Sequence, residues 1–139
     1  MAAYESTKIT TEAPPRAGLG ITAVGATFTF PSAPALNDTV KMFTLPKGAR
    51  VHEMVFASDD LDTGGTPAIM LQVGTGATAD YFIAASNIAQ AGGMTRLSQK
   101  GALLEELSAD TDVIVKVSAA PATGATGTIR LACIYSLEL

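Results

Sequence analysis

Short runs in which apolar and polar residues alternate, separated by proline or glycine, are the feature that most limits how this chain can fold. The clearest run covers residues 128–139, where one face carries Ile129, Leu131, Cys133, Tyr135 and Leu137. A period of two places alternate side chains on the same face of a β-strand. Every proline from residue 31 onward lies between such runs or at the edge of one, where a strand tolerates a missing N–H group. The pattern therefore predicts a protein built from short β-strands.

The runs place strands at residues 21–30, 40–45, 51–57, 68–73, 94–97, 102–107, 113–117 and 128–139. Residues 102–107 also have helical spacing of their leucines, but the turn that follows favours a hairpin with 113–117. Residues 80–90 are the one helix-like segment, with Asp80 as a possible cap and Gly92-Gly93 as its end. Strands at a spacing of about ten residues predict an all-β fold. We expect an antiparallel β-sandwich, jelly-roll-like ahead of immunoglobulin-like, with at most one short helix.

Two regions differ in character along the chain. Residues 1–19 are polar and contain Pro14-Pro15, with too little apolar periodicity to form a core. We expect an N-terminal arm over 1–19, either disordered or lying on a neighbour, and a single β-sandwich domain over 20–139.

The charge pattern excludes several classes of partner. The net charge is −4, and the basic residues are scattered, whereas a nucleic-acid surface needs them clustered. The longest uncharged stretch, residues 17–37, is rich in glycine, threonine and proline and does not suit a membrane helix. The first residues have no secretory signal pattern, so we expect synthesis in a cytoplasm. Charged residues make up only 16% of the chain, which favours a surface covered by another subunit over a neutral surface without a partner.

Few residues could carry chemistry. His52 is the only histidine and Cys133 the only cysteine, and Cys133 falls on the apolar face of the last predicted strand. A catalytic or metal-binding pair of the two is therefore disfavoured against a core cysteine. No serine lies in a nucleophile-elbow motif. We predict no catalytic residue, no cofactor and no metal site, and hence no enzyme.

The acidic cluster Asp59, Asp60 and Asp62, followed by Gly64, loosely resembles a calcium loop. An EF-hand loop needs a glutamate at its twelfth position, which is Met70 or Leu71 here. Aspartate and glycine also suit an ordinary turn between strands. We favour the turn and keep a weak surface cation site as the alternative.

Several segments are similar to a known family. They are residues 45–51 (LPKGARV), 60–64 (DLDTG), 66–74 (TPAIMLQVG), 89–93 (AQAGG) and 120–129 (APATGATGTI). Together they resemble the capsid decoration proteins of tailed bacteriophages, also called cement or head-stabilisation proteins, over about residues 43–135. The resemblance implies a virion structural protein on the capsid exterior, made in the host bacterium. It implies the major capsid protein and copies of the same chain, in a homotrimer, as partners, and it carries over no site residues.

Two other functions fit the same predicted fold. One is a tail, baseplate or fibre component of the virion. The other is a carbohydrate-binding jelly-roll module, which would need exposed tryptophan or tyrosine around a groove. The sequence has no tryptophan, and Tyr4, Tyr81 and Tyr135 are far apart along the chain.

Overall fold

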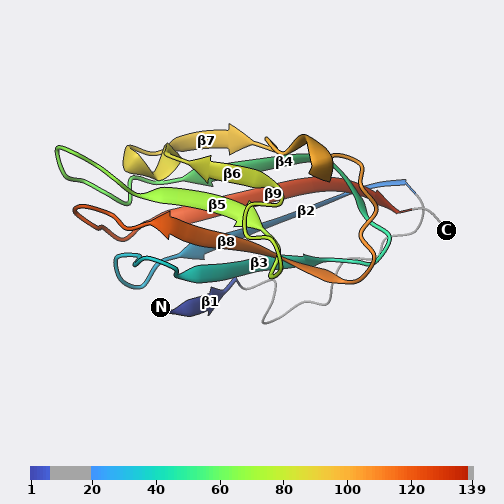
Figure 1. Cartoon of the computed structure of the whole chain (residues 1–139), viewed down its shortest axis with the longest axis horizontal. Helices are drawn as coiled ribbons and strands as arrows, with labels where there is room; N and C mark the ends of the chain where they lie inside the picture. The colour runs from blue at the N-terminus through green and yellow to red at the C-terminus, as the bar shows by residue number, and fades with distance from the viewer. Residues whose placement is uncertain (7–19, 138–139) are drawn as a thin grey trace.

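The computed structural model describes residues 1–6 and 20–137, and these residues form two β-sheets packed face to face (Figure 1). The strands are β1 (Ala3–Glu5), β2 (Gly20–Thr29), β3 (Thr39–Leu45), β4 (Arg50–Ser58), β5 (Met70–Gly74), β6 (Ile83–Ser86), β7 (Gly93–Arg96), β8 (Thr111–Ala119) and β9 (Thr128–Leu137). The two short 3-10 helices are η1 (Ile88–Gln90) and η2 (Lys100–Ala102). Within the described part of the chain, no helix has the length and apolar character needed to cross a bilayer.

The strand order identifies the sandwich as a jelly roll. One sheet has four strands in the order β2-β9-β4-β7, and the other has five in the order β1-β3-β8-β5-β6. The antiparallel pairs β2·β9, β3·β8, β4·β7 and β5·β6 are nested, as in one long hairpin wrapped into two sheets. The predicted antiparallel, jelly-roll-like sandwich is confirmed.

The core lies between the sheets and is built by the alternation seen in the sequence. On β9, Ile129, Leu131, Cys133 and Tyr135 are buried, while the residues between them point outward. The largest fully buried side chains are those of Tyr135, Phe30, Phe43, Phe56 and Phe82. Burial of such aromatic and aliphatic side chains stabilises the fold by roughly 1.5–3 kcal/mol each.

The beginning of the chain adds a strand that the sequence pattern does not predict. Strand β1 pairs in parallel with β3, at the edge of the five-stranded sheet. Its Tyr4 ring lies 5.1 Å from the Phe28 ring and 5.9 Å from the Phe30 ring, so β1 also contacts the edge of the other sheet. The buried Asp38 carboxylate accepts a hydrogen bond from the Ala2 N–H (2.7 Å). Residues 7–19 of the predicted arm lie outside the described residues, so that arm stays a prediction.

The helix predicted over residues 80–90 is wrong. The structure has strand β6 at Ile83–Ser86 and only the 3-10 turn η1 after it. Strand β6 pairs with β5, with Val73 opposite Ile83, and the side chains of Phe82 and Ile83 are buried in the core. Pairing with a sheet edge satisfies the backbone and buries these side chains, and such tertiary gain outweighs the weak helix propensity of a short segment.

The strand predicted over residues 102–107 is also wrong. The segment begins with the last residue of η2 and makes only isolated bridges, between Leu103 and Val51 and between Glu106 and Arg50. Leu104 has a φ of 63°, a left-handed conformation that interrupts an extended strand. Ala102 and Leu107 are buried, and the segment crosses the start of β4 instead of forming a hairpin with β8.

Candidate functional site

The acidic cluster that the sequence singles out forms a structural junction between two loops. Asp62 is 1% exposed, and its carboxylate accepts four backbone N–H groups. The donors are Ala68 (2.7 Å), Ile69 (3.1 Å), Ala122 (2.9 Å) and Thr123 (2.7 Å). The loop after β4 is thereby joined to the loop before β9, which lies 60 residues further along the chain.

These hydrogen bonds also set the protonation of Asp62. Burial alone would raise the pKa of this carboxyl, but the four N–H donors stabilise its charged form, and its pKa falls from 3.8 to about 2. Asp60 accepts the Asp62 N–H (3.0 Å), and Asp59 accepts the Thr128 N–H (2.9 Å). Each of the three carboxylates therefore accepts at least one backbone N–H group of the loops, as expected of an aspartate-rich turn. No group of three or more potential metal ligands occurs among residues 1–6 and 20–137.

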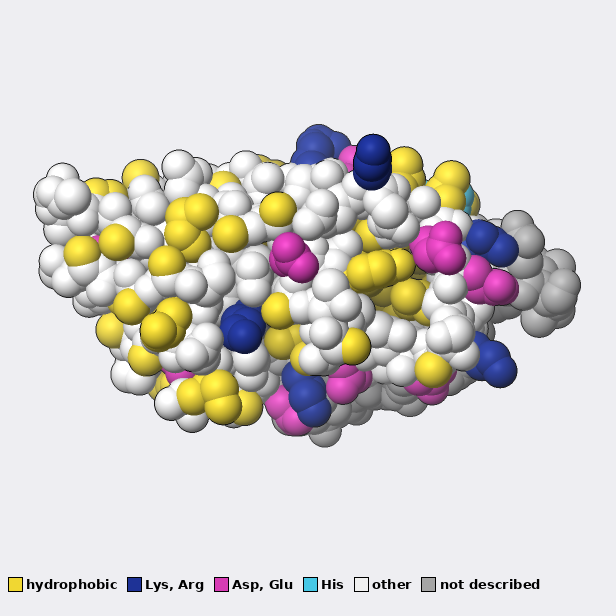
Figure 2. Space-filling view, in the orientation of Figure 1, with side chains coloured by type: hydrophobic (Ala, Val, Ile, Leu, Met, Phe, Trp, Pro, Cys, Tyr) yellow, Lys and Arg dark blue, Asp and Glu magenta, His cyan; other side chains and the backbone are white. Residues whose placement is uncertain are grey.

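The two loops tied by Asp62, residues 59–69 and 119–127, lie beside residues 31–38 at one end of the sandwich (Figure 1). We call these three segments the neutral end, because nearly all their side chains are uncharged. The Thr63 N–H donates to the Thr123 carbonyl (2.9 Å), and the Ala125 N–H donates to the Leu61 carbonyl (3.0 Å). The only charged residues here are Asp38, Asp59, Asp60 and Asp62, and each accepts at least one backbone N–H. Small and uncharged side chains therefore cover most of this end, and few charges appear at the left of Figure 2, where these loops lie.

His52 and Cys133 lie on opposite faces of the four-stranded sheet. His52 is exposed, and its Nε2 lies 2.9 Å from the Ser136 hydroxyl. Cys133 points into the core, and burial raises the pKa of its thiol to about 12. The structure therefore does not bring the two residues together as a catalytic or metal-binding pair.

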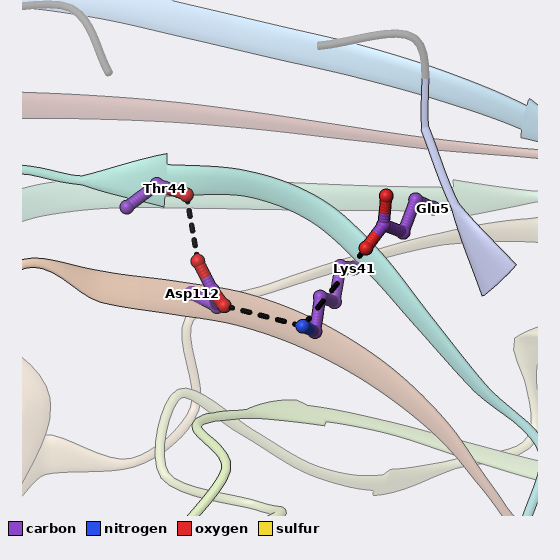
Figure 3. Close-up of polar contacts among 4 residues, drawn as sticks. All are labelled: Glu5, Lys41, Thr44 and Asp112. Carbon is purple, nitrogen blue, oxygen red and sulfur yellow. Dashed lines mark hydrogen bonds and ion pairs between the residues drawn. The ribbon is translucent and has the colours of Figure 1, made fainter. Parts of the chain in front are cut away.

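The outer face of the five-stranded sheet carries a small network of charges. The Lys41 ammonium lies 4.0 Å from the Glu5 carboxylate and 3.7 Å from that of Asp112 (Figure 3). The Thr44 hydroxyl donates to the other Asp112 oxygen (2.7 Å). One lysine on β3 thus links β1 on one side to β8 on the other.

A hollow of about 740 Å³ adjoins this network. Four carboxylates line it, and Lys41 is its only basic residue; the four are Glu105, Glu106, Asp110 and Asp112. Tyr81 also lines the hollow, and burial and then the nearby charge of Glu105 raise the pKa of its phenol. The hollow is an acidic surface, unsuited to an anionic ligand.

The outer face of the four-stranded sheet has the opposite character. A shallow depression of about 710 Å³ runs across β2, β9, β4 and β7. Its lining is mostly small and apolar: Gly25, Ala26, Thr27, Val55, Ala57, Met94, Arg130, Leu131 and Ala132. Met94 is 67% exposed. Such a face suits contact with another protein surface.

Sequence patterns missed most of these features for identifiable reasons. The outward residues of β2, β4 and β9 could be identified as small and apolar, but only the register shows that they adjoin Met94. Likewise, no pattern in the sequence around Lys41 predicts its ion pairs with Glu5 and Asp112, which are distant along the chain. The described residues thus form three surfaces of different character, namely the neutral end, the acidic hollow and the apolar depression.

Solved structures contain close relatives of this fold. A chain in the capsid of Ralstonia phage GP4 superposes with a TM-score of 0.86 and 32% identity, over 99% of both chains. A chain in the cyanophage Pam1 capsid asymmetric unit has a TM-score of 0.80 and 32% identity, over 91% of both chains. A chain in the acid-stable capsid of Helicobacter pylori bacteriophage KHP30 shares the fold, with a TM-score of 0.62 and 20% identity over 84% of this chain. No protein-family model and no curated protein matches the sequence.

The first two relatives share almost a third of their residues with this chain and match it from end to end or nearly so. Both relatives are chains of phage capsids. The chain therefore belongs to the family of phage capsid proteins found in the Ralstonia phage GP4 and cyanophage Pam1 capsids, and it is a virion structural protein.

Proposed function

We propose that this protein is a decoration protein, which binds the outer surface of the shell formed by the major capsid protein and stabilises it. The observation that carries the proposal is the match to a capsid component over 99% of both chains. The match extends over nearly the whole jelly roll, so the fold as a whole, and not one part of it, is shared with a chain of a capsid. We further propose that it acts without catalysis, as a homotrimer.

The neutral end is the surface that best suits the shell. Small side chains allow close approach of two backbones. Asp38 and Asp62 are buried and bound by N–H groups, so of its four carboxylates only those of Asp59 and Asp60 would lose water on contact. A stable interface buries about 1,200–2,000 Å² in total, and many identical copies multiply its effect on the lattice. Such contacts across the seams between capsomers would oppose internal pressure.

Co-sedimentation with expanded, undecorated shells of the same phage tests this proposal. We expect saturable binding and a higher temperature of shell disruption after binding. Thr66→Lys, at an exposed position of the neutral end, should weaken binding because a long charged side chain would hold the two surfaces apart and would lose water on contact. Ser108→Lys is the matched control, since it adds the same charge at an exposed position outside the neutral end and should bind normally. Failure of the unmodified protein to bind any capsid state would refute the proposal.

The alternative functions have less support. A tail, baseplate or fibre role would predict the protein in separated tails by mass spectrometry, whereas the relatives belong to capsids. A carbohydrate-binding role would need exposed aromatic rings. Tyr135 is buried, Tyr4 packs on Phe28 and Phe30, and Tyr81 packs on Phe82, so the described residues form no aromatic platform.

A further inference from the structure

Strand β2 is an edge strand without the features that usually protect an edge. It is ten residues long and lies at the end of the four-stranded sheet, and among residues 1–6 and 20–137 it pairs with β9 alone. Its sequence, GITAVGATFT, has no charged residue and no proline, and its register with β9 runs without a bulge. Natural sheets usually blunt such edges with lysine, proline, bulges or short strands, because a long flat edge can pair with another chain.

The register shows which backbone groups of β2 face away from β9. The Phe30 N–H donates to the Gly127 carbonyl (3.0 Å), so Phe30 and Gly127 form a hydrogen-bonded pair. In an antiparallel ladder such pairs recur at every second residue, so the even-numbered residues of β2 bond to β9. The Asp59 N–H donates to the Thr128 carbonyl, so the even-numbered residues of β9 bond to β4. The odd-numbered residues of β9 are then the ones that bond to β2, which agrees with the Phe30–Gly127 pair. The outward groups therefore belong to Ile21, Ala23, Gly25, Thr27 and Thr29.

The outward edge of β2 is complementary to itself. Two β2 strands related by a two-fold axis at Gly25 would pair Ile21 with Thr29 of the other copy, Ala23 with Thr27, and Gly25 with Gly25. In this register, each residue whose N–H and C=O point away from β9 lies opposite another such residue. All the residues that face one another are uncharged. Glycine at the axis leaves no side chains to collide there.

We propose that the edge of β2 pairs antiparallel with the edge of β2 in a second copy of this chain, which joins two four-stranded sheets into one. Ala26 and Phe28, on the inner face of β2, are only half-buried within one copy and would gain cover from the other. An edge of ten residues is about 34 Å long, and with a depth of about 10 Å it buries roughly 700 Å² in total, less than a standard interface. The contact is therefore weak in dilute solution and favoured where copies are concentrated. It is a two-fold contact, so it is separate from any three-fold contact within a trimer.

Hydrogen exchange followed by NMR at two protein concentrations about a hundredfold apart tests the pairing residue by residue. The N–H groups of Thr22, Val24, Ala26 and Phe28 bond to β9 and should be protected at both concentrations. Those of Ala23, Gly25 and Thr27 should exchange fast in dilute protein, and at least about tenfold more slowly in concentrated protein. The average mass from sedimentation equilibrium should rise in parallel.

Two kinds of edge variant should abolish this concentration dependence. Gly25→Pro removes an N–H that β9 does not use, at a site where an added Cβ would meet its nearest neighbour, the Leu131 carbonyl oxygen, at an ordinary 3.5 Å. Ala23→Lys with Thr27→Lys keeps every backbone bond and sets like charges opposite each other across the junction. The control is Ala132→Lys, one strand inward on the same outer face, which should associate like the unmodified protein.

Three results would overturn the pairing. The odd-numbered N–H groups could stay unprotected at every concentration. They could instead be protected equally in dilute protein, which would show that the chain covers its own edge. Finally, Ala132→Lys could block association while the edge variants do not, which would assign the contact to the outer face of the sheet. None of these results depends on whether the protein binds a capsid.

Discussion

Gly74 is the position where the structure predicts the largest effect of a single added methyl group. It ends β5, and residues 75–82 fold back over it, with the Thr75 N–H bonded to the Thr78 carbonyl (2.9 Å) and the Phe82 N–H to the Val73 carbonyl (3.0 Å). A Cβ at Gly74 would overlap the carbonyl oxygen of Thr78 and lie 2.5 Å from that of Ala79. These neighbours are backbone atoms, which cannot rotate away as a side chain can.

The cost of Gly74→Ala can be estimated from these contacts. Overpacking of a well-packed site costs about 1–3 kcal/mol. Distortion of the turn would weaken one or two hydrogen bonds, at about 1 kcal/mol each. Alanine also restricts the unfolded chain more than glycine does, and this offsets about 0.4–1 kcal/mol of the cost. We therefore expect a net loss of about 2–3 kcal/mol in the free energy of unfolding, or a Tm lower by about 6–12 °C for a domain of this size.

Gly76→Ala is the matched control two residues away in the same turn. A Cβ there has nothing within 4 Å, so the substitution should be neutral or stabilise by up to about 1 kcal/mol. Denaturant and thermal unfolding followed by circular dichroism would measure both variants. If Gly74→Ala unfolds within about 0.5 kcal/mol of Gly76→Ala, the close packing of residues 75–82 over β5 is refuted.

Three further predictions concern other parts of the molecule. The pKa of Asp62 is lowered to about 2 in the folded state, so its charge stabilises the fold above about pH 4, and this contribution is lost as the pH falls towards 2. Asp62→Asn should therefore lower the denaturation midpoint far more at pH 6 than at pH 2. An equal loss at both pH values would contradict a stabilising role of the Asp62 charge. The Cys133 thiol, with a pKa of about 12, should react with a thiol reagent at pH 8 only in denaturant, and rapid labelling of the folded protein would count against its burial. Lys41→Met should lower the free energy of unfolding by at most about 1 kcal/mol at low salt and by nothing measurable in 1 M salt, because the ion pairs with Glu5 and Asp112 are half-exposed. A loss of stability that does not depend on salt would show that Lys41 acts through packing and not through its charge.

The strands that sequence patterns predict correctly are those whose evidence is local. Alternation along β8 and β9 reports which side chains face the core, and proline and glycine mark the turns, so the jelly-roll-like sandwich follows from the sequence. Strand β1 has only three residues, too few for a period to be seen.

The errors occurred where partners distant in sequence decide the structure. Residues 83–86 join a sheet edge because Val73 is there to pair with Ile83, and no pattern within the segment reveals that edge. Leu104 adopts a left-handed conformation that leucine rarely takes, in a segment held by bonds to β4. The aspartate-rich turn could be predicted at 59–62, but the donors at 122 and 123 that bury Asp62 could not.

A cryo-EM reconstruction of the intact virion tests the proposed role most directly. The account predicts density for this jelly roll on the outside of the shell, with its neutral end (residues 31–38, 59–69 and 119–127) against the major capsid protein and three copies around each occupied local three-fold axis. Density for the fold confined to the tail, or to the inner surface of the shell, would contradict it.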